Sequence, residues 1–317
     1  MIRIRQPISD RWHLAFGVIS IISLIGTYSY LSLSRQATKR AEIGRQIVAV
    51  DDQLGKLPSE GGQPVDRGTA ERLKTQRERL VAEQAVAIDR TVPTWRALWN
   101  DGLLRVLQPQ GLKKNEYWLW EDTLATLGRL GAGLLVGVLA SVVLGLLMGA
   151  YAPIEAFFVP PLSFLAKIPP TAMLAVFFVL VGTSFKMYVA MIAFGILPTL
   201  AQNVYESAKN DVPDALVDKA YTLGASQIEL IWNVLYKQIL PRVLDAVRLQ
   251  IGPAMVVLVA AEWMVSDQGY GYRLRLFYQR TDMTVVYLYC FLLGAIGLLA
   301  DYALIAVRRW ICPWFGD

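Results

Sequence analysis

Long apolar runs are the feature that most constrains what this chain can fold into. The first run, residues 14–33, follows Arg3, Arg5 and Arg11 and contains no charged residue. A helix needs about 20 mostly apolar residues to cross a bilayer, because it rises about 1.5 Å per residue across about 30 Å of hydrocarbon. The run is too long for the core of a signal peptide, and no small-residue cleavage site follows it. It therefore predicts a retained membrane helix.

Six predicted spans account for most of the apolar residues. The third span contains the pair Pro169 and Pro170, so we expect it to be kinked, with the freed backbone groups satisfied inside a helix bundle. The chain is therefore predicted to be an all-α integral membrane protein with six transmembrane helices. The spans are residues 14–33, 127–151, 157–165 with 172–181, 186–205, 245–264 and 283–307.

A polar insert separates the first two spans. Ile43, Ile47, Val50 and Leu54 alternate four and three residues apart, which is the spacing of a coiled-coil seam. Residues 58–68 are rich in Gly and Pro and predict a turn, after which residues 70–89 return as a second helix. The resulting extracytoplasmic helical hairpin is either a docking surface for a partner or a spacer that grew in a tolerant loop. The predicted divisions are residues 1–34 with the first span, the insert at 35–119, and a core at 120–317 with five spans.

Basic residues near the span ends predict the orientation. Those before the first span, between the fourth and fifth, and after the sixth all fall on one side when there are six spans. Because basic residues are enriched on the cytoplasmic side, we expect both termini in the cytoplasm. Arg35 and Lys39 oppose this orientation, but the insert that they begin is longer than the roughly 60 residues over which loop charge sorts topology.

Catalytic signatures are missing from the sequence. It contains no G-x-x-x-x-G-K-[ST] phosphate loop, no G-x-S-x-G elbow, no H-E-x-x-H motif and no cluster of Cys or His residues. We therefore expect no enzyme activity, no cofactor and no metal site. The net charge of +5 fits the basic ends of membrane spans better than a nucleic-acid partner.

Three charged residues within the predicted spans are candidates for a translocation path or gate. They are Arg248, Glu262 and Asp301. Charges inside a membrane are costly and are therefore functional candidates by default. The alternative is that Arg248 and Asp301 lie near the cytoplasmic interface and Glu262 near the outer one.

The segment at residues 206–241 is too polar to enter lipid, yet its pattern predicts an ordered helix, turn and helix. Pro213 can begin the first helix, and Asp214 and Asp218 suit the positive end of its dipole. Gly224 is a typical helix stop, and a second helix at 226–240 leads to Pro241 and the next span. Such a segment is either an amphipathic connector or a rigid surface helix that receives a push from a cytosolic partner.

This same segment resembles the EAA motif of ABC importer permeases. The similarity lies in Asp218-Lys219-Ala220-Tyr221-Thr222-Leu223-Gly224-Ala225-Ser226, followed by Pro241. Over roughly the last 200 residues the chain is similar to permeases of the nitrate, sulfonate, taurine and bicarbonate group. That similarity includes Ile168-Pro169-Pro170, Val247-Arg248-Leu249, Val259-Ala260-Ala261-Glu262, Gly269-Tyr270-Gly271-Tyr272 and Gly297-Leu298-Leu299-Ala300-Asp301, in the same order.

The resemblance implies an ATP-driven importer that works by alternating access. Its implied partners are ABC ATPase subunits, an extracytoplasmic solute-binding protein, a second copy of the permease and the lipid of a bacterial inner membrane. Lys219, and Tyr236-Lys237 in place of the family's Leu-Pro pair, depart from the usual pattern and leave the substrate class open. The residues implied to couple to the ATPase are Ala215, Asp218, Lys219, Ala220, Leu223, Gly224, Ala225, Ser226 and Pro241.

Two other classes of membrane protein remain as alternatives. A receptor or scaffold would use the outer hairpin to sense a ligand, but it would need a cytosolic output domain, and few residues follow the sixth span. A gradient-driven secondary transporter would favour internal repeats with paired interrupted helices, which the sequence does not display. Co-purification with an ATPase separates the importer from both.

Overall fold

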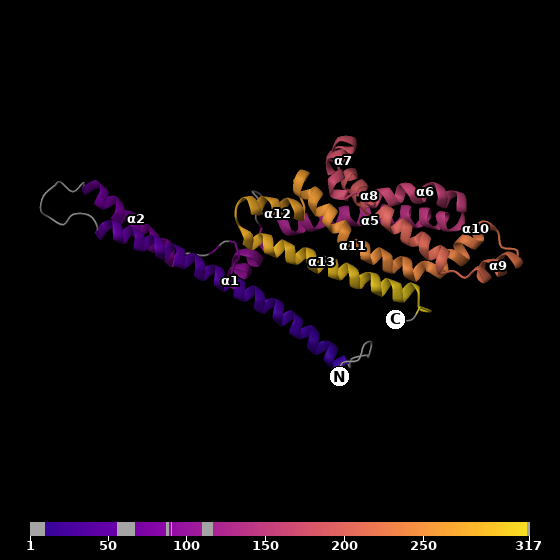
Figure 1. Cartoon of the computed structure of the whole chain (residues 1–317), viewed down its shortest axis with the longest axis horizontal. Coiled ribbons are helices and arrows are strands. Elements are labelled where there is room, and N and C mark those ends of the chain that lie inside the picture. Colours follow the sequence, from indigo (N-terminus) through magenta and orange to yellow (C-terminus); the bar gives the residue numbers. More distant parts are fainter. Residues whose placement is uncertain (1–9, 56–66, 87–88, 90, 110–116, 316–317) are drawn as a thin grey trace. The chain divides into compact units, whose positions relative to one another are not determined.

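The computed structural model describes residues 10–55, 67–86, 89, 91–109 and 117–315, and its regular elements within these ranges are all helices. Four long apolar stretches lie in the last two thirds of the chain: α5 (Trp118–Ala150), α8 (Phe185–Asn210), Gln227–Val265 and α13 (Met283–Ile311). The fifth belongs to α1 (Asp10–Gly55). All five are long and apolar enough to cross a membrane, which confirms an all-helical chain with several candidate spans (Figure 1).

The predicted third span is sharply bent. It consists of α6 (Ala152–Leu165) and a second arm, Pro170–Val181, made of η2 (Pro170–Met173) and α7 (Leu174–Val181). The arms meet at 85°. Pro170 forces Pro169 out of helical geometry, to a ψ of 124°, because the residue before a proline clashes with its ring in the α conformation. The pair is either one broken span or a re-entrant loop, so the described helices give five or six spans.

The chain forms two compact units. The first is Met1–Arg105 with Arg280–Val285, and the second is Val106–Gln279 with Val286–Asp317. In the first unit α1 pairs antiparallel with α2 (Arg67–Val86), since Gln84 donates to the Arg40 carbonyl and Arg77 pairs with Asp51. The helix α1 is continuous from Asp10 to Gly55, so the predicted boundary between residues 34 and 35 lies inside it. The predicted hairpin turn falls largely outside the described residues.

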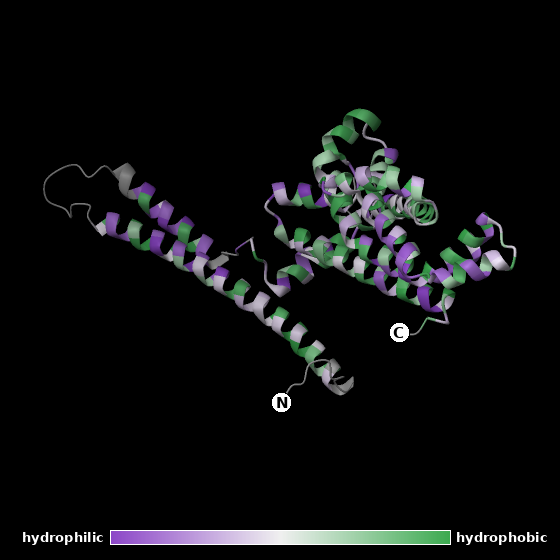
Figure 2. Ribbon diagram, turned by 45° about the vertical axis from the view of Figure 1, so that its right-hand side comes forward, coloured by the Kyte–Doolittle hydropathy of each residue, from purple (hydrophilic) through white to green (hydrophobic). Residues whose placement is uncertain are grey.

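Hydropathy changes along the first unit. In Figure 2, α1 is mostly apolar near the N-terminus and polar where it pairs with α2. Ile43 and Val50 of the predicted seam are buried. A short helical segment that the sequence did not predict follows the hairpin: α3 (Trp95–Ala97), η1 (Leu98–Leu104) and α4 (Arg105–Leu107).

Glycines bring α5 and α8 together in the second unit. A Cβ added at Gly133 would lie 2.6 Å from Ile192, and one at Gly145 would lie 2.7 Å from the Ala201 carbonyl oxygen. Small residues of this kind let membrane helices approach closely, where van der Waals packing holds them. The resulting α5–α8 pair is the centre of the core.

The predicted helix at 226–240 continues directly into the fifth span. The stretches α10 (Gln227–Glu229), η3 (Leu230–Tyr236) and α11 (Lys237–Val265) follow one another without interruption, so the predicted end of this helix at residue 240 is wrong. Pro241 is buried inside α11. Proline removes only one backbone donor, and packing by neighbouring helices keeps such a helix intact in a membrane protein. The structure adds α12 (Tyr270–Gln279), which the sequence did not predict as a helix.

Candidate functional site

The predicted coupling segment forms the short helix α9 (Asp214–Thr222) between α8 and α10. Pro213 is its N-cap and Leu223 its C-cap. Gly224 has a φ of 84°, a conformation that other residues adopt only with strain. The amide of Gly224 donates to the Tyr221 carbonyl and that of Ala225 to the Ala220 carbonyl, at 2.9 and 3.0 Å. These bonds form a Schellman motif, which explains why the pattern has glycine at 224.

A second cap fixes the chain directly after this turn. The Ser226 hydroxyl accepts from the Glu229 amide at 3.3 Å, and the Glu229 carboxylate accepts from the Ser226 amide at 2.9 Å. This reciprocal pair is a capping box. The connection from Leu223 to Ser226 is therefore held at both ends by backbone hydrogen bonds.

The two faces of α9 differ. Val217 and Ala220 pack against a buried cluster that includes Val212 and Leu230, so Ala220 points inward. Apolar side chains on and after α9 are exposed instead: Leu216, Tyr221, Leu223 and Ile228, with Leu223 79% exposed. Other predicted coupling residues also differ in exposure. Asp218 and Lys219 are exposed on α9, whereas Pro241 is buried in α11.

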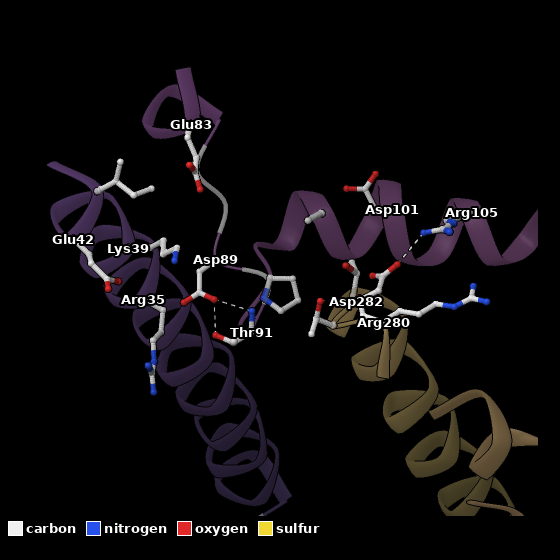
Figure 3. Close-up of a pocket in the computed structure, with 15 residues that line it drawn as sticks. Arg35, Lys39, Glu42, Glu83, Asp89, Thr91, Asp101, Arg105, Arg280 and Asp282 are labelled. Atoms are coloured by element: carbon white, nitrogen blue, oxygen red, sulfur yellow. Dashed lines mark hydrogen bonds and ion pairs between the residues drawn. The ribbon is translucent and has the colours of Figure 1, made fainter. Parts of the chain in front are cut away.

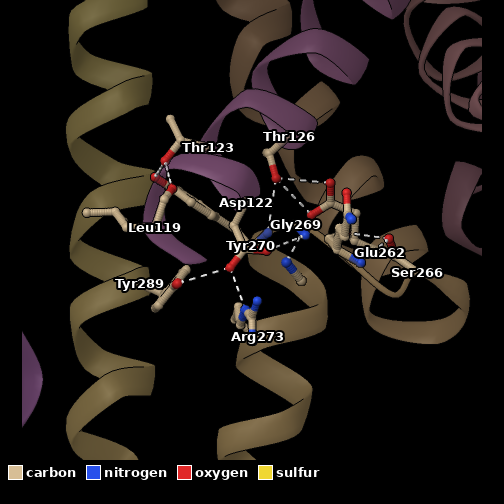
Figure 4. Close-up of polar contacts among 12 residues, drawn as sticks. Leu119, Asp122, Thr123, Thr126, Glu262, Ser266, Gly269, Tyr270, Arg273 and Tyr289 are labelled. Atoms are coloured by element: carbon tan, nitrogen blue, oxygen red, sulfur yellow. Dashed lines mark hydrogen bonds and ion pairs between the residues drawn. The ribbon is translucent and has the colours of Figure 1, made fainter. Parts of the chain in front are cut away.

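Glu262 lies in a sealed polar cluster where α5, α11 and α12 meet (Figure 4). Its side chain has no exposed area, and its carboxylate accepts from Arg129 at 2.8 Å, Thr126 at 3.0 Å and the Gly271 amide at 2.9 Å. A Cβ at Gly271 would lie 2.4 Å from the Val259 carbonyl oxygen. Only glycine lets the backbone come this close to the carboxylate. The structure thus places Glu262 in the packed interior and not on an open surface.

A second buried carboxylate, Asp122, extends the same cluster. It accepts from Arg273 at 2.5 Å, from the Gly269 amide at 2.8 Å and from the Tyr289 hydroxyl at 3.1 Å. Gly269 has a φ of 110°, which turns the chain from α11 into α12. Burial raises the pKa of the nearby Tyr270 phenol above its usual value, so this hydroxyl keeps its proton in its contact with Thr123.

Sequence reasoning missed Asp122, Arg273 and Tyr289. Asp122 precedes the second predicted apolar run and Arg273 follows the fifth, so neither lies inside a predicted span. The sequence signal for the pair is that Asp122 and Arg273 carry opposite charges and lie beside two spans, α5 and α11, that are neighbours in the fold. That signal becomes visible only once the helix neighbours are known.

Arg248 and Asp301, the other two path candidates, form an ion pair between α11 and α13. A second pair, Asp245 with Arg308, joins the same helices at 2.9 Å. The Arg248 and Asp301 side chains remain 36% and 32% exposed, in contrast to the sealed carboxylate of Glu262.

The first unit has a cavity of about 1000 Å³ with charged walls of both signs (Figure 3). Arg35, Lys39 and Glu42 line it from α1, while Asp101 and Arg105 line it from the helical segment after the hairpin. Arg105 pairs with Asp282 at 2.9 Å. No group of three or more His, Cys, Asp or Glu residues that could hold a metal ion occurs among the described residues.

Comparison with known proteins shows the family to which the chain belongs. A family model described as the binding-protein-dependent transport system inner membrane component matches residues 137–315. The taurine transport system permease protein TauC of Escherichia coli (strain K12) is 26% identical over 215 residues, which cover 68% of this chain and 77% of TauC. The bicarbonate transport system permease protein CmpB of Synechocystis sp. is 25% identical over 229 residues, covering 70% and 80% of the two chains.

The chain is also similar to transport proteins that are named for other solutes. The formylaminopyrimidine transport permease protein ThiX of Halalkalibacterium halodurans is 25% identical over 190 residues, covering 60% of this chain and 76% of ThiX. Among solved structures, a chain of the MetNI methionine ABC transporter in an inward-facing conformation has a TM-score of 0.48 and 20% identity. It covers 61% of this chain and 94% of the MetNI chain.

Proposed function

Because this chain belongs to the family of binding-protein-dependent transport system inner membrane components, we propose that it is the permease of an ATP-driven importer whose ATP is hydrolysed by a separate subunit. The chain supplies membrane helices and a cytosolic coupling surface, and it is a transport subunit rather than an enzyme. Two copies form the translocation path in the inner membrane of a bacterium. An extracytoplasmic binding protein delivers the solute to them.

The observation that carries this proposal is the rigid, apolar surface at α9. The Schellman motif and the capping box hold Leu223 in one position, with its side chain 79% exposed. An exposed apolar side chain on a rigid support is a suitable anchor for a partner's pocket. Closure of the ATPase pair pushes on α9, and its packing through Val217 and Ala220 transmits the push to the membrane helices.

We propose a small oxyanion as the cargo. Relatives named for taurine and bicarbonate transport support this class, since both solutes carry an anionic oxygen-bearing group. The ThiX relative is named for formylaminopyrimidine, so the family as a whole does not restrict the cargo to anions.

The test is to express the chain with its genomic neighbours, to ask whether an ATPase co-purifies with it, and then to measure uptake. The wild type should elute from detergent with the ATPase in a near one-to-one ratio. The double variant Asp218→Lys, Leu223→Ala should lose the ATPase and ATP-dependent uptake. Thr75→Lys introduces a positive charge on the exposed part of α2 and should behave as wild type. Unchanged uptake by the double variant would contradict the role of α9.

A further inference from the structure

Arg248 and Asp301 lie near the midpoints of their helices. Asp301 is four residues from the middle of α13, and Arg248 is three residues from the middle of α11. In the predicted spans 245–264 and 283–307, Arg248 and Asp301 are six to seven residues from the centre, which is within about 10 Å at about 1.5 Å per residue. The hydrocarbon layer extends about 15 Å on either side of its centre, so the pair sits at hydrocarbon depth in a bundle that spans the bilayer.

The exposed part of this ion pair therefore needs a polar neighbour. A charge that faces lipid at this depth is costly, and charged residues within spans face the bundle interior or a water-filled cavity. The two buried carboxylates, Asp122 and Glu262, meet this condition because they have no exposed area. Arg248 and Asp301 do not, since about a third of each side chain is open in the single chain.

The helix that carries Asp301, α13, is loosely packed around the ion pair. From Cys290 to Ile311, no side chain of α13 is buried. Ion pairs at Asp301 and Arg308, together with the packing of Leu304, hold this part of α13 to the core. A helix tied by long polar bridges at its own mid-depth is suited to form the wall of an aqueous space.

Only one of the three side-chain nitrogens of Arg248 donates a hydrogen bond among the described residues. Within the described part of the chain it donates through Nε alone, to Asp301. Its two terminal nitrogens keep the planar fork that matches two oxygens of a carboxylate, sulfonate or similar group. Asp301 is the resident counter-ion, and an arriving anion must compete with it. This competition keeps binding weak, as release from a transport path requires.

We propose that Arg248 is an anion-binding residue on the wall of the translocation path, with Asp301 as its exchangeable counter-ion. This inference rests on the proposed transport function and deepens it, because it assigns the anion contact to one of three candidate charges. Glu262 is excluded from that role in this conformation by its burial.

The test uses thiol reagents of opposite charge on the full chain co-expressed with its ATPase. In a background with Cys290→Ala and Cys312→Ala, Asp301→Cys places a thiol beside Arg248. A methanethiosulfonate that carries a sulfonate is itself a small oxyanion, and it should react about tenfold faster than the trimethylammonium reagent. Adding Arg248→Gln should abolish that preference. Leu299→Cys, two residues away and 68% exposed, should face lipid and react with neither reagent.

Two outcomes would overturn the proposal. Protection of Asp301→Cys from both reagents would mean that lipid or a second copy of the chain covers the pair. Reaction without any charge preference would mean that Arg248 does not attract anions. Ile305→Cys, one helical turn from Asp301, keeps the ion pair intact and reports water access if Asp301→Cys does not fold. ATPase co-purification from the same preparation tests the proposed importer function independently of the anion site.

Discussion

Asp122 and Glu262 show how single residues connect distant parts of the membrane bundle. Each is fully buried, and each accepts from one arginine and from a backbone amide of the turn into α12. Asp122 and Arg273 are 151 positions apart in the chain. A buried ion pair adds little net stability, but removing one partner leaves an uncompensated charge.

We expect Glu262→Gln to be strongly destabilising, by about 3–5 kcal/mol, because it leaves the Arg129 side chain, only 11% exposed, without its counter-charge. The measurement is thermal unfolding of the detergent-solubilised protein. The double variant Arg129→Gln, Glu262→Gln should recover part of the loss. Asp51→Asn breaks an exposed pair with Arg77 and should change stability by no more than about 1 kcal/mol. Equal losses for Glu262→Gln and Asp51→Asn would contradict the role of the sealed cluster.

The capping of α9 gives a prediction for Gly224. Its φ of 84° is open to Gly and tolerated by Asn, but it strains β-branched residues. Gly224→Val should therefore shift the turn that positions Leu223 and weaken ATPase co-purification, whereas Gly224→Asn should largely preserve it. If both variants bind the ATPase equally, the turn does not set the coupling surface.

Besides apolar clusters, close glycine contacts and polar bridges join elements of this chain. The pair α5–α8 packs through glycines, while α11 and α13 are joined by two ion pairs. The first kind of contact is rigid because the backbones touch. The second can be exchanged for water or an anion, as the role proposed for Arg248 requires.

Gly145 and Gly131, both on α5, provide a matched test of the close packing. A Cβ at Gly145 would lie 2.7 Å from the Ala201 carbonyl oxygen, whereas nothing lies within 4 Å of one at Gly131. Gly145→Ala should cost about 1–3 kcal/mol by overpacking, and Gly131→Ala should be neutral or stabilise by up to about 1 kcal/mol through helix propensity. Unfolding in detergent compares them. A stable Gly145→Ala variant would show that α8 can move away from α5.

The span count decides the topology of the whole molecule. With α6 and α7 as one broken span, three crossings separate the insert from α9, so they lie on opposite sides of the membrane. A re-entrant pair leaves two crossings and places them on the same side. The charge distribution favours the first arrangement, with both termini in the cytoplasm.

Cysteine labelling of intact cells distinguishes the two arrangements. In the background without Cys290 and Cys312, we expect an impermeant thiol reagent to label Thr75→Cys in intact cells and Thr222→Cys only after lysis. Thr75 is exposed on α2, and Thr222 is exposed at the end of α9. Labelling of both positions from outside would indicate a re-entrant pair and five spans.

The local features of this protein are readable from its sequence, because they depend on residues close together in the chain. Apolar length predicted the membrane helices, heptad spacing predicted the α1–α2 pair, and Pro213 with Gly224 predicted the bounds of α9 to within a residue or two. The similarity to importer permeases was also visible in ordered motifs, and the family comparison confirms it.

Other features depend on which helices become neighbours, and only the tertiary structure decided them. The unbroken helix through Pro241 and the sealed cluster at Asp122 both need contacts between distant segments. Glu262 and Arg248 carried the same signal in the sequence, a charge inside an apolar run. Packing buried one completely and left the other partly open, because burial is a property of the surrounding helices and not of the residue's own segment.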